Sequence, residues 1–549
     1  MRGTCTTSTC AHWQSAVPLR PFALVAILLV LLPGGCRAFV TDSSSPTTRS
    51  AGSEQISILV LPRAVRVARK TVSVKKHPRT LLAFKPSDRS DDGIYTSAAE
   101  KEKEGTAGDG EGTVPYFSIV LPLLLVYISN QWSRSSLYYL VNFSDSPDAT
   151  AFTAMNVDLG FTQAQYGALA SVAFTALFAV ASLFAGSYAD KSDRRALTAG
   201  SAAVWSAATL GTAAAAGYGQ VVLARIIMGL ACAFSTPAAY TLIRDTVPKE
   251  RAAFANSLYG GGIYLGGALS SLSILLDNSL GWRGALVAIG VYGVLCALLS
   301  LFLLPPDQKD IEDEGSTALL QKTERAVKEQ SGEAGSPTVV ADAKEVLSIP
   351  RVQWLFLAAF FRFCSGLCIG VWSAPYFKSA FPDDSTTYAV VNAFIVGFCG
   401  VSSGVLGGYF ADKTSQYSSS DENSARLTVP IVGSILAVPS WWLTVSASTF
   451  EQAMFWLGVE YLVAECWFGP AVAVLQSSVG PKRGGTAQGM FTLTGAIGNL
   501  APSFLGVLYG KATSQGVEGE VALSHLLEVA VCAGYLISAL CFYMAKRTK

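Results

Sequence analysis

The chain has 549 residues, of which 51% are hydrophobic and only 14% charged, and its mean hydropathy is +0.39. Soluble proteins carry about 25% charged residues, so this composition excludes a single soluble core. A net charge of +1 offers no bulk positive charge for binding nucleic acid. The three histidines are too few for a histidine-based metal centre or catalytic triad, and the eleven cysteines lack metal-ligand or disulfide spacing. We therefore expect no enzymatic activity, no metal and no other cofactor.

The N-terminal region has the pattern of a targeting sequence. Residues 1–38 contain an arginine flank, a short apolar run and a Pro-Gly-Gly break, which predict a signal peptide; a retained membrane anchor is the alternative. Residues 39–114 are predicted to be a basic, Ser-rich segment typical of a transit peptide, followed by a disordered linker. Together they resemble the two-part targeting sequence of plastids acquired by secondary endosymbiosis, which would place the protein in a plastid envelope. An endomembrane or plasma-membrane protein with a basic tail is the alternative.

Apolar stretches of about 20 residues follow, each long enough to cross a bilayer as a helix. They predict an all-α membrane protein with twelve transmembrane helices, in an N-terminal six-helix bundle (115–304), a charged central loop (305–350) and a C-terminal six-helix bundle (351–549). The expected spans are 116–140, 164–185, 197–217, 219–243, 256–276, 283–304, 352–377, 386–410, 427–447, 452–477, 485–509 and 522–544.

The two halves repeat each other, which favours one structural unit used twice. Residues 185–191 resemble residues 407–413, at the end of the second span of each half. Pro237 and Pro248 match Pro470 and Pro481 in the same way, and we expect the prolines inside spans to kink them. The sequence therefore predicts two pseudo-symmetric bundles.

Basic residues set the orientation of the bundles. Loops after odd-numbered spans contain only Arg283, Lys378 and Lys511. Loops after even-numbered spans and the C-terminal tail, with the central loop left out, contain Lys191, Arg194, Arg195, Arg244, Lys249, Arg251, Lys413, Arg426, Lys482, Arg483, Lys546, Arg547 and Lys549. Both ends of the membrane domain are thus predicted to face the cytosol, or the stroma of a plastid.

Residues 186–195, GSYADKSDRR, follow the second span. They resemble the G-x-x-x-D-R/K-x-G-R-R/K loop of the major facilitator superfamily, although Asp193 stands where the second glycine is usual. The sequence from Arg225 to Gly229 resembles the R-x-x-x-G signature of the fourth span. This resemblance implies the two-bundle fold of that superfamily, with a gating latch formed by Gly186, Asp190, Arg194 and Arg195 and a partial second copy at Asp412.

Other segments resemble the Spinster-like and organic-anion branches of the superfamily. These are residues 248–252, the glycines between 260 and 267, and Gly281-Trp282-Arg283. In those branches the first span often carries an Asp-Arg pair and the fourth a Gly-Glu-Ala. This chain has Ser133-Arg134 and residues 231–233, Ala-Cys-Ala, so both acids are absent. Proton or sodium coupling through those acids is therefore not expected here.

Ionisable side chains inside spans are costly and tend to be paired, cavity-facing or functional. The embedded charges are Arg134, Arg225, Arg362, Glu460 and Glu465. All five fall on the first, fourth, seventh and tenth spans, which line the central cavity in the superfamily. At about 1.5 Å per residue, Arg134 and Arg225 lie in the outer third, while Arg362 and Glu465 lie at nearly one level and are predicted to pair. The excess of arginine favours an anionic substrate.

The candidate substrate-binding residues are three of these charged residues together with aromatic side chains and one glutamine on the same spans. Packing roles are the alternative for each of them. These candidates are Gln131, Arg134, Tyr138, Arg362, Trp372, Tyr376, Glu465 and Trp467. The candidate coupling and gating residues are Glu465, Arg225, Gly186, Asp190, Arg194, Arg195 and Asp412. Glu465 is the candidate carrier if a proton is moved.

We therefore expect a secondary active or facilitative transporter of a small organic solute, anionic or amphipathic, that works by alternating access. Its partners would be that solute, membrane lipids and a proton or ion co-substrate, and we expect a monomer. Uniport and exchange are alternatives to proton coupling. The competing hypothesis is a non-transporting sensor or scaffold on the same fold, with residues 305–350 as its partner surface.

Overall fold

The computed structural model describes residues 117–144, 152–189, 192–305, 339–417, 421–480 and 483–548. The predicted signal peptide, transit segment and linker, and most of the central loop, lie outside these residues. Within the described ranges the regular structure is helical, as the sequence predicts.

The N-terminal half contains the helices of the first six predicted spans. They are α2 (Phe117–Ser135), η1 (Ser136–Tyr139), α3 (Met155–Asp158), α4 (Gln163–Ala170), α5 (Val172–Ala189), α6 (Arg194–Ala213), α7 (Tyr218–Thr246), α8 (Lys249–Gly260), α9 (Gly262–Ser271) and α10 (Ser273–Leu303). Gly281 has a φ of +69° and interrupts the helical backbone within α10. Because glycine adopts positive φ without strain, the chain ends the fifth span and begins the sixth at this residue.

The C-terminal half has the same order of spans, with more short interruptions. Its helices are α13 (Val339–Ser348), α14 (Pro350–Ala380), η2 (Pro382–Asp384), α15 (Ser385–Phe394), the π-helical η3 (Ile395–Cys399), α16 (Gly400–Tyr417), α17 (Glu422–Arg426), α18 (Thr428–Val445), α19 (Phe450–Ala464), η4 (Glu465–Trp467), α20 (Phe468–Val479), α21 (Gly484–Gly498), α22 (Ala501–Ser514) and α23 (Gly519–Arg547).

Helices cover every one of the twelve predicted spans. In the described part of the chain, nine helices or runs of helices are long and apolar enough to cross a membrane. The predicted first, third and fifth spans are helical but do not meet the combined criteria of length and composition, so the full count of twelve stays a prediction. Pro237 and Pro375 lie inside the continuous helices α7 and α14, whereas the tenth span is interrupted by η4 three residues before Pro470.

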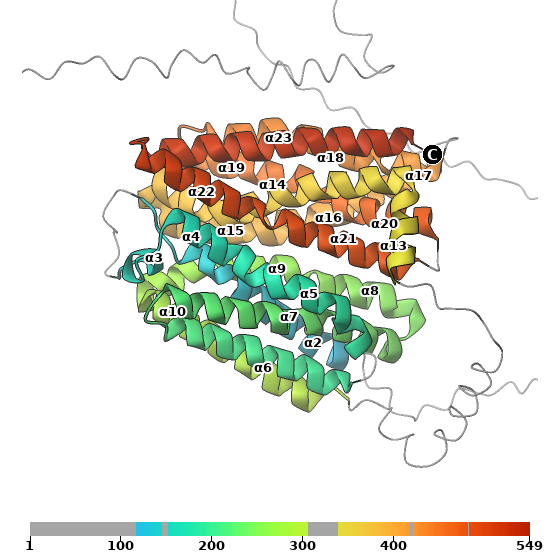
Figure 1. The fold of residues 1–549 in the computed structure, drawn as a ribbon, viewed down its shortest axis with the longest axis horizontal. Helices are drawn as coiled ribbons and strands as arrows, with labels where there is room; N and C mark the ends of the chain where they lie inside the picture. The colour runs from blue at the N-terminus through green and yellow to red at the C-terminus, as the bar shows by residue number, and fades with distance from the viewer. Residues whose placement is uncertain are drawn as a thin grey trace, which may run out of the picture. The chain divides into compact units, whose positions relative to one another are not determined.

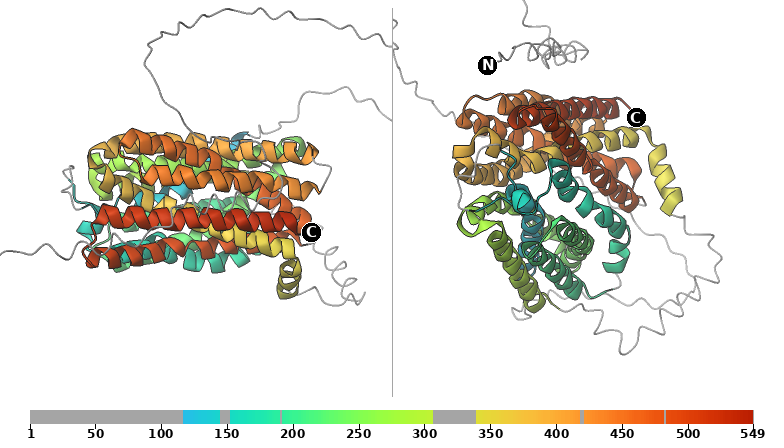
Figure 2. Two further views of the ribbon diagram at one scale, coloured as in Figure 1. Left: turned by 90° about the horizontal axis from the view of Figure 1, so that it is seen from above. Right: turned by 60° about the vertical axis from the view of Figure 1, so that its left-hand side comes forward.

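The helices form two groups that follow the order of the chain, and the predicted two-bundle arrangement is confirmed. In Figure 1 helices α2–α10 form one group and helices α14–α23 the other, with the helices of both groups running side by side. The right-hand view in Figure 2 shows the same separation. Within the bundles, α5 packs on α7 and α6 on α10, while α14 packs on α23.

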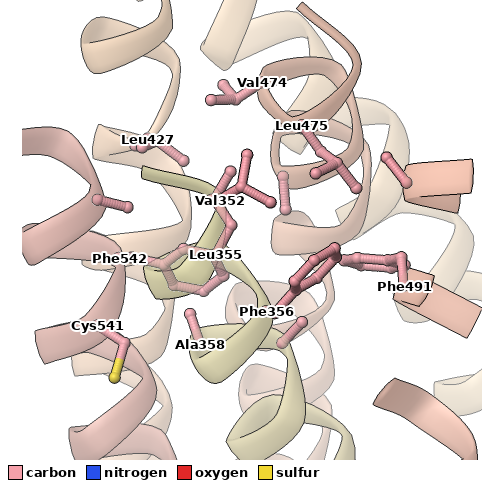
Figure 3. Packing of buried hydrophobic residues seen from close by; sticks show 14 of the residues in the cluster. Val352, Leu355, Phe356, Ala358, Leu427, Val474, Leu475, Phe491, Cys541 and Phe542 are labelled. Carbon is pink, nitrogen blue, oxygen red and sulfur yellow. The ribbon is translucent and has the colours of Figure 1, made fainter. Parts of the chain in front are cut away.

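A hydrophobic cluster holds together the inner half of the C-terminal bundle. Val352, Leu355 and Phe356 of α14 pack with Phe542 of α23 and Phe491 of α21, as Figure 3 shows. Close packing is the main force between helices in a bilayer, because lipid tails are as apolar as these side chains. The cluster therefore fixes the level and rotation of α14 just before Arg362.

Candidate functional site

A charged cluster lies in the middle of the C-terminal bundle. Arg362 of α14 is 1% exposed, and its Nη2 lies 3.4 Å from Oε1 of Glu465 in η4. The same nitrogen donates a hydrogen bond of 2.7 Å to the carbonyl oxygen of Ala464. Glu465 remains 26% exposed. The predicted pairing of Arg362 with Glu465 is confirmed, and Glu465 is the more exposed member of the pair.

The break between α19 and α20 creates this arrangement. Pro470 has no backbone N–H, and its ring crowds the carbonyl group four residues earlier, that of Cys466. The chain tightens into the 3₁₀ turn η4 at residues 465–467 before it continues as α20. The Ala464 carbonyl lies at this turn and accepts a hydrogen bond from the buried guanidinium.

Two further side chains complete the cluster. Glu460 is buried and accepts a hydrogen bond from the hydroxyl group of Tyr535 in α23. The guanidinium of Arg362 lies over the ring of Tyr535, 4.5 Å from its centroid, and 5.7 Å from the ring of Trp467. Glu460 thus makes a helix–helix contact. Sequence reasoning missed Tyr535, because a lone tyrosine in an apolar span carries no signal of its partner.

The N-terminal bundle contains two arginines close together. Nη1 of Arg225 in α7 donates a 2.7 Å hydrogen bond to the carbonyl oxygen of Arg134 in α2, and it also contacts the sulfur of Met228. The guanidinium of Arg134 lies 4.6 Å from the centroid of the Phe174 ring. Arg225 is buried and Arg134 half-buried. Within the described residues neither arginine forms an ion pair with a carboxylate.

This position of Arg225 follows from the end of α2. The helix gives way to the 3₁₀ turn η1 after Ser135, and Arg225 binds the carbonyl group of Arg134 next to that junction. One nitrogen of Arg225, Nη2, is buried without a hydrogen-bond partner. Arg225 therefore joins α7 to α2, and it retains donor capacity for a further acceptor.

The other predicted substrate-binding residues differ in their exposure. Gln131 is half-buried. Tyr138, Trp372 and Tyr376 are buried, and each donates a hydrogen bond to a backbone carbonyl group, those of Ala170, Pro502 and Val445. Trp467 is 4% exposed and packs edge-on against Phe363, with ring centroids 5.1 Å apart. In this conformation these four rings have packing roles, and their contact with a substrate stays a prediction.

An aromatic cluster joins the two bundles near their outer ends. The hydroxyl group of Tyr166 in α4 donates a 2.6 Å hydrogen bond to the carbonyl oxygen of Val371 in α14. The rings of Tyr166 and Trp372 meet edge to face, with centroids 4.9 Å apart, and Phe143 and Tyr509 pack around them. Trp372 therefore belongs to the closure between the bundles.

Polar contacts extend this closure. Lys378 at the outer end of α14 donates to the carbonyl oxygens of Tyr139 and Val141, at 2.6 and 3.1 Å. Asn392 of α15 donates to the hydroxyl groups of Tyr139 and Ser271, at 3.3 and 3.0 Å. These hydrogen bonds hold the two bundles together at this end.

The closure reaches the middle of the membrane through α4, α5 and α22. Asn499, just before α22, donates hydrogen bonds to Thr175 and to the carbonyl oxygen of Ser171, while Ser503 donates to the carbonyl oxygen of Gly167. Thr175 lies about 21 Å from the inner end of α5, given the rise of about 1.5 Å per residue. The hydrogen bonds described between the bundles thus run from the middle of the spans to the end that the basic loops predict to be outer.

The predicted latch at the inner end of the N-terminal bundle is described in part. Asp190 lies outside the described residues, and so do the surroundings of Gly186 in α5. Arg194 is buried and forms an ion pair with Asp245 at the end of α7. Arg195 is half-buried, and its backbone N–H donates to the side chain of Asp193 at 2.9 Å. The residue that replaces the usual glycine therefore caps α6.

In the C-terminal bundle, Asp412 at the end of α16 lies 3.4 Å from Arg426 in α17. Both latch segments thus contain an ion pair, but Arg194 reaches an acid at the end of the fourth span, whereas Asp412 and Arg426 lie on either side of one loop. Sequence reasoning missed Asp245, although an acid beside Arg244 at the end of an apolar span was a usable signal.

The chain folds into two bundles of membrane-crossing helices, and each bundle contains embedded charges. This arrangement is typical of a membrane transporter built from two bundles. The family model of the Major Facilitator Superfamily matches residues 123–502. The chain belongs to this superfamily, as its motifs predicted.

Individual relatives support this assignment. The chain is 25% identical over 399 residues to an MFS-type efflux pump of Mycolicibacterium smegmatis, covering 71% of this chain and 85% of the pump. It is 26% identical over 219 residues to the 4-hydroxybenzoate transporter of Pseudomonas putida, covering 38% of this chain but only 48% of that protein.

Solved structures show the same fold. A bacterial homologue of the human lysosomal transporter Spinster, in an inward-facing and unoccupied conformation, has a TM-score of 0.62 at 20% identity and covers 79% of this chain and 98% of that chain. A D-xylose-proton symporter has a TM-score of 0.55 at 15% identity, covering 78% of this chain and 96% of that chain.

Proposed function

We propose that the protein carries a small organic solute with an anionic group across a membrane by alternating access, and that the closed outer end represents its inward-facing state. One observation carries this proposal: Arg134 and Arg225 lie together, and within the described residues neither has a carboxylate partner. Arginine stays charged at physiological pH, and a charge in a span is costly without a counter-ion. An anionic group on the solute would supply it.

The surroundings support an amphipathic solute. Phe174 lies under the guanidinium of Arg134, and Gln131 is half-buried one turn earlier on α2. A carboxylate could bind the arginine while an apolar body contacts the rings of the same helices. Tyr138, Trp372 and Tyr376 would become available to the solute as the outer closure opens.

Liposomes that contain the purified protein would test this proposal. We suggest 4-hydroxybenzoate as the first probe, because it combines a carboxylate with an aromatic ring and is the solute named for one relative. We expect uptake of this probe, and a loss of at least tenfold in R134Q, whereas R547Q, at the exposed end of α23, should retain transport. A neutral ester of the same ring should be transported poorly.

Equal transport of the neutral ester and the anion would contradict the assignment of the arginines. Absence of flux for a broad panel of solutes under every imposed gradient would favour the scaffold hypothesis instead.

Glu465 is our candidate for coupling transport to protons. It is the partly exposed carboxylate of the cluster, and its ion pair with Arg362 would have to break and re-form as the bundles move. We expect E465Q to remove the dependence of uptake on an imposed pH gradient. E451Q, at the outer end of the same span, is the matched control. Unchanged pH dependence in E465Q would favour uniport or solute exchange.

We further propose that the protein acts as a monomer in a plastid envelope, directed there by residues 1–90. The basic, Ser-rich composition of residues 39–90 supports this location. A fluorescent protein fused after residue 90 should enter plastids in an alga with secondary plastids. A purely secretory distribution of the fusion would contradict the proposal.

A further inference from the structure

A cavity of about 510 Å³ lies at the inner end of the C-terminal bundle, away from the arginines and the charge cluster. Residues of α16, α17, α18 and α23 line it, and it is open on one side. Its lining includes Phe410, Lys413, Tyr417, Ser424, Thr428 and Lys546. None of these residues takes part in the proposed transport site.

The cavity carries positive charge without a matching acid. Lys413 is exposed, and Nζ of Lys546 donates a 2.8 Å hydrogen bond to the hydroxyl oxygen of Thr428. Neither lysine has a carboxylate within 4.0 Å in the described part of the chain. An ammonium group has three donors, so both lysines retain N–H groups for another acceptor.

Two acids close to the cavity in the sequence already have basic partners. Asp412 lies 3.4 Å from Arg426, and Asp421 lies 2.5 Å from Arg351. These pairs neutralise the acids on α16 and before α17. The two lysines therefore give the cavity a net positive charge, which favours an anionic ligand.

Two exposed aromatic side chains also line the cavity. Phe410 is 50% exposed and Tyr417 is 81% exposed. Aromatic residues at the end of a span commonly lie at the level of lipid headgroups. A small inorganic anion would leave these rings exposed, whereas a lipid would cover Phe410 with its acyl chain.

The position of the cavity along the spans agrees with this chemistry. The span containing α16 ends at Tyr417, the span containing α18 begins at Glu422, and α23 ends at Arg547. The basic loops lie at this same end of the bundles. The cavity is therefore at the headgroup level of the inner leaflet, where an anionic surface attracts lysine and arginine.

We propose that this cavity binds the phosphate-bearing headgroup of an anionic phospholipid. Lys413 and Lys546 contact the phosphate, Thr428 and Tyr417 offer hydroxyl groups, and the first acyl carbons lie along Phe410. The bound lipid connects α16 to α18 and α23, and so stabilises the inner end of the C-terminal bundle.

Thermal unfolding of the full-length protein in detergent would test this site. Phosphatidylglycerol should raise the unfolding temperature in a saturable way, and phosphatidylcholine with the same acyl chains should do so much less. Each lysine near an anionic lipid contributes about a fivefold gain in affinity. We therefore expect K413Q and K546Q each to raise the half-saturating phosphatidylglycerol concentration about fivefold, and the double variant about 25-fold. K413R should retain most of the affinity.

R547Q is the matched control, because Arg547 lies at the same end of α23 but its guanidinium stacks on Tyr543, 5.1 Å from the ring centroid, and does not line the cavity. Its half-saturating concentration should change less than twofold. An equal loss in R547Q and K546Q would show diffuse attraction and overturn the site. Equal protection by phosphatidylcholine would overturn the role of charge. Full protection by inorganic phosphate alone would overturn the lipid as the ligand.

Discussion

Replacing Arg362 with methionine and Glu465 with glutamine, singly and together, should reveal a coupling energy of about 1–3 kcal/mol between the two positions. The methionine keeps the unbranched stem of arginine, and the glutamine keeps the shape of glutamate. Each single variant therefore removes one charge with little change in packing. If the pair is stabilising, the double variant should unfold less easily than the sum of the two single losses predicts.

The magnitude follows from the geometry of the pair. At 3.4 Å and an effective dielectric constant of about 20, two unit charges attract each other by about 5 kcal/mol. Glu465 is 26% exposed, and water near it screens the attraction below this value. The dehydration of each group belongs to its own single-variant loss and cancels in the cycle, so the expected coupling is about 1–3 kcal/mol.

The assay is unfolding of the detergent-solubilised protein by titrated SDS, followed by tryptophan fluorescence. The control cycle combines Arg362→Met with Glu451→Gln, since Glu451 lies in the first turn of α19, about 21 Å along the span from Glu465 at about 1.5 Å per residue. Its coupling should be below about 0.5 kcal/mol. A coupling equally small for Arg362 and Glu465 would refute the conclusion that their ion pair stabilises the bundle.

Two further predictions concern packing and pH. A Cβ on Gly229 would lie 2.1 Å from the carbonyl oxygen of Phe174, so G229A should force α5 and α7 apart and cost about 3 kcal/mol in the same SDS assay, whereas G219A, with no heavy atom within 4 Å, should be nearly neutral. Partial burial acts to raise the pKa of Asp421, but hydrogen bonds from Arg351 and Ser424 and the charge of Arg351 outweigh it and hold that pKa below its usual value. The ionised carboxylate therefore stabilises the fold above about pH 4, and this contribution is lost as the pH falls through the lowered pKa. D421N should lower the free energy of unfolding at pH 7 by less than about 1 kcal/mol, because Asp421 is 42% exposed, and a difference that persists at pH 2 would contradict this reasoning.

Sequence reasoning predicted a contact in the candidate site where two residues meet because they lie at the same depth in the membrane. Counting residues from the predicted ends of their spans, at about 1.5 Å per residue, places Arg362 and Glu465 at one level. In the structure the side chains of this pair lie 3.4 Å apart. The pairing of Arg194 with Asp245 required more, because Asp245 is one of several acids near the inner surface. The hydrogen bond between Glu460 and Tyr535 depends on which faces of α19 and α23 meet, and hydropathy does not specify this.

The aromatic residues on the candidate substrate helices also show that sequence reasoning places a residue on a span but does not specify its contacts. Trp372, Tyr376 and Tyr138 lie on the expected spans, but their hydrogen bonds to backbone carbonyl groups reveal packing and outer closure in this conformation. A transporter samples more than one arrangement of its bundles, so a single sequence position can be buried in one state and exposed in another.

The sequence by itself determined the helical spans, the duplication of the halves, the basic inner surface and the superfamily. These features depend on local composition, because a bilayer requires about 20 apolar residues for each helix and holds basic loops on one side. Tertiary structure alone decided which helix faces meet: the two arginines joined at the end of α2, the outer closure through Lys378 and Asn392, and the basic cavity between α16, α18 and α23. Such contacts depend on the rotation of each helix about its axis and on side-chain packing between distant segments, and neither is encoded in the hydropathy of a single span.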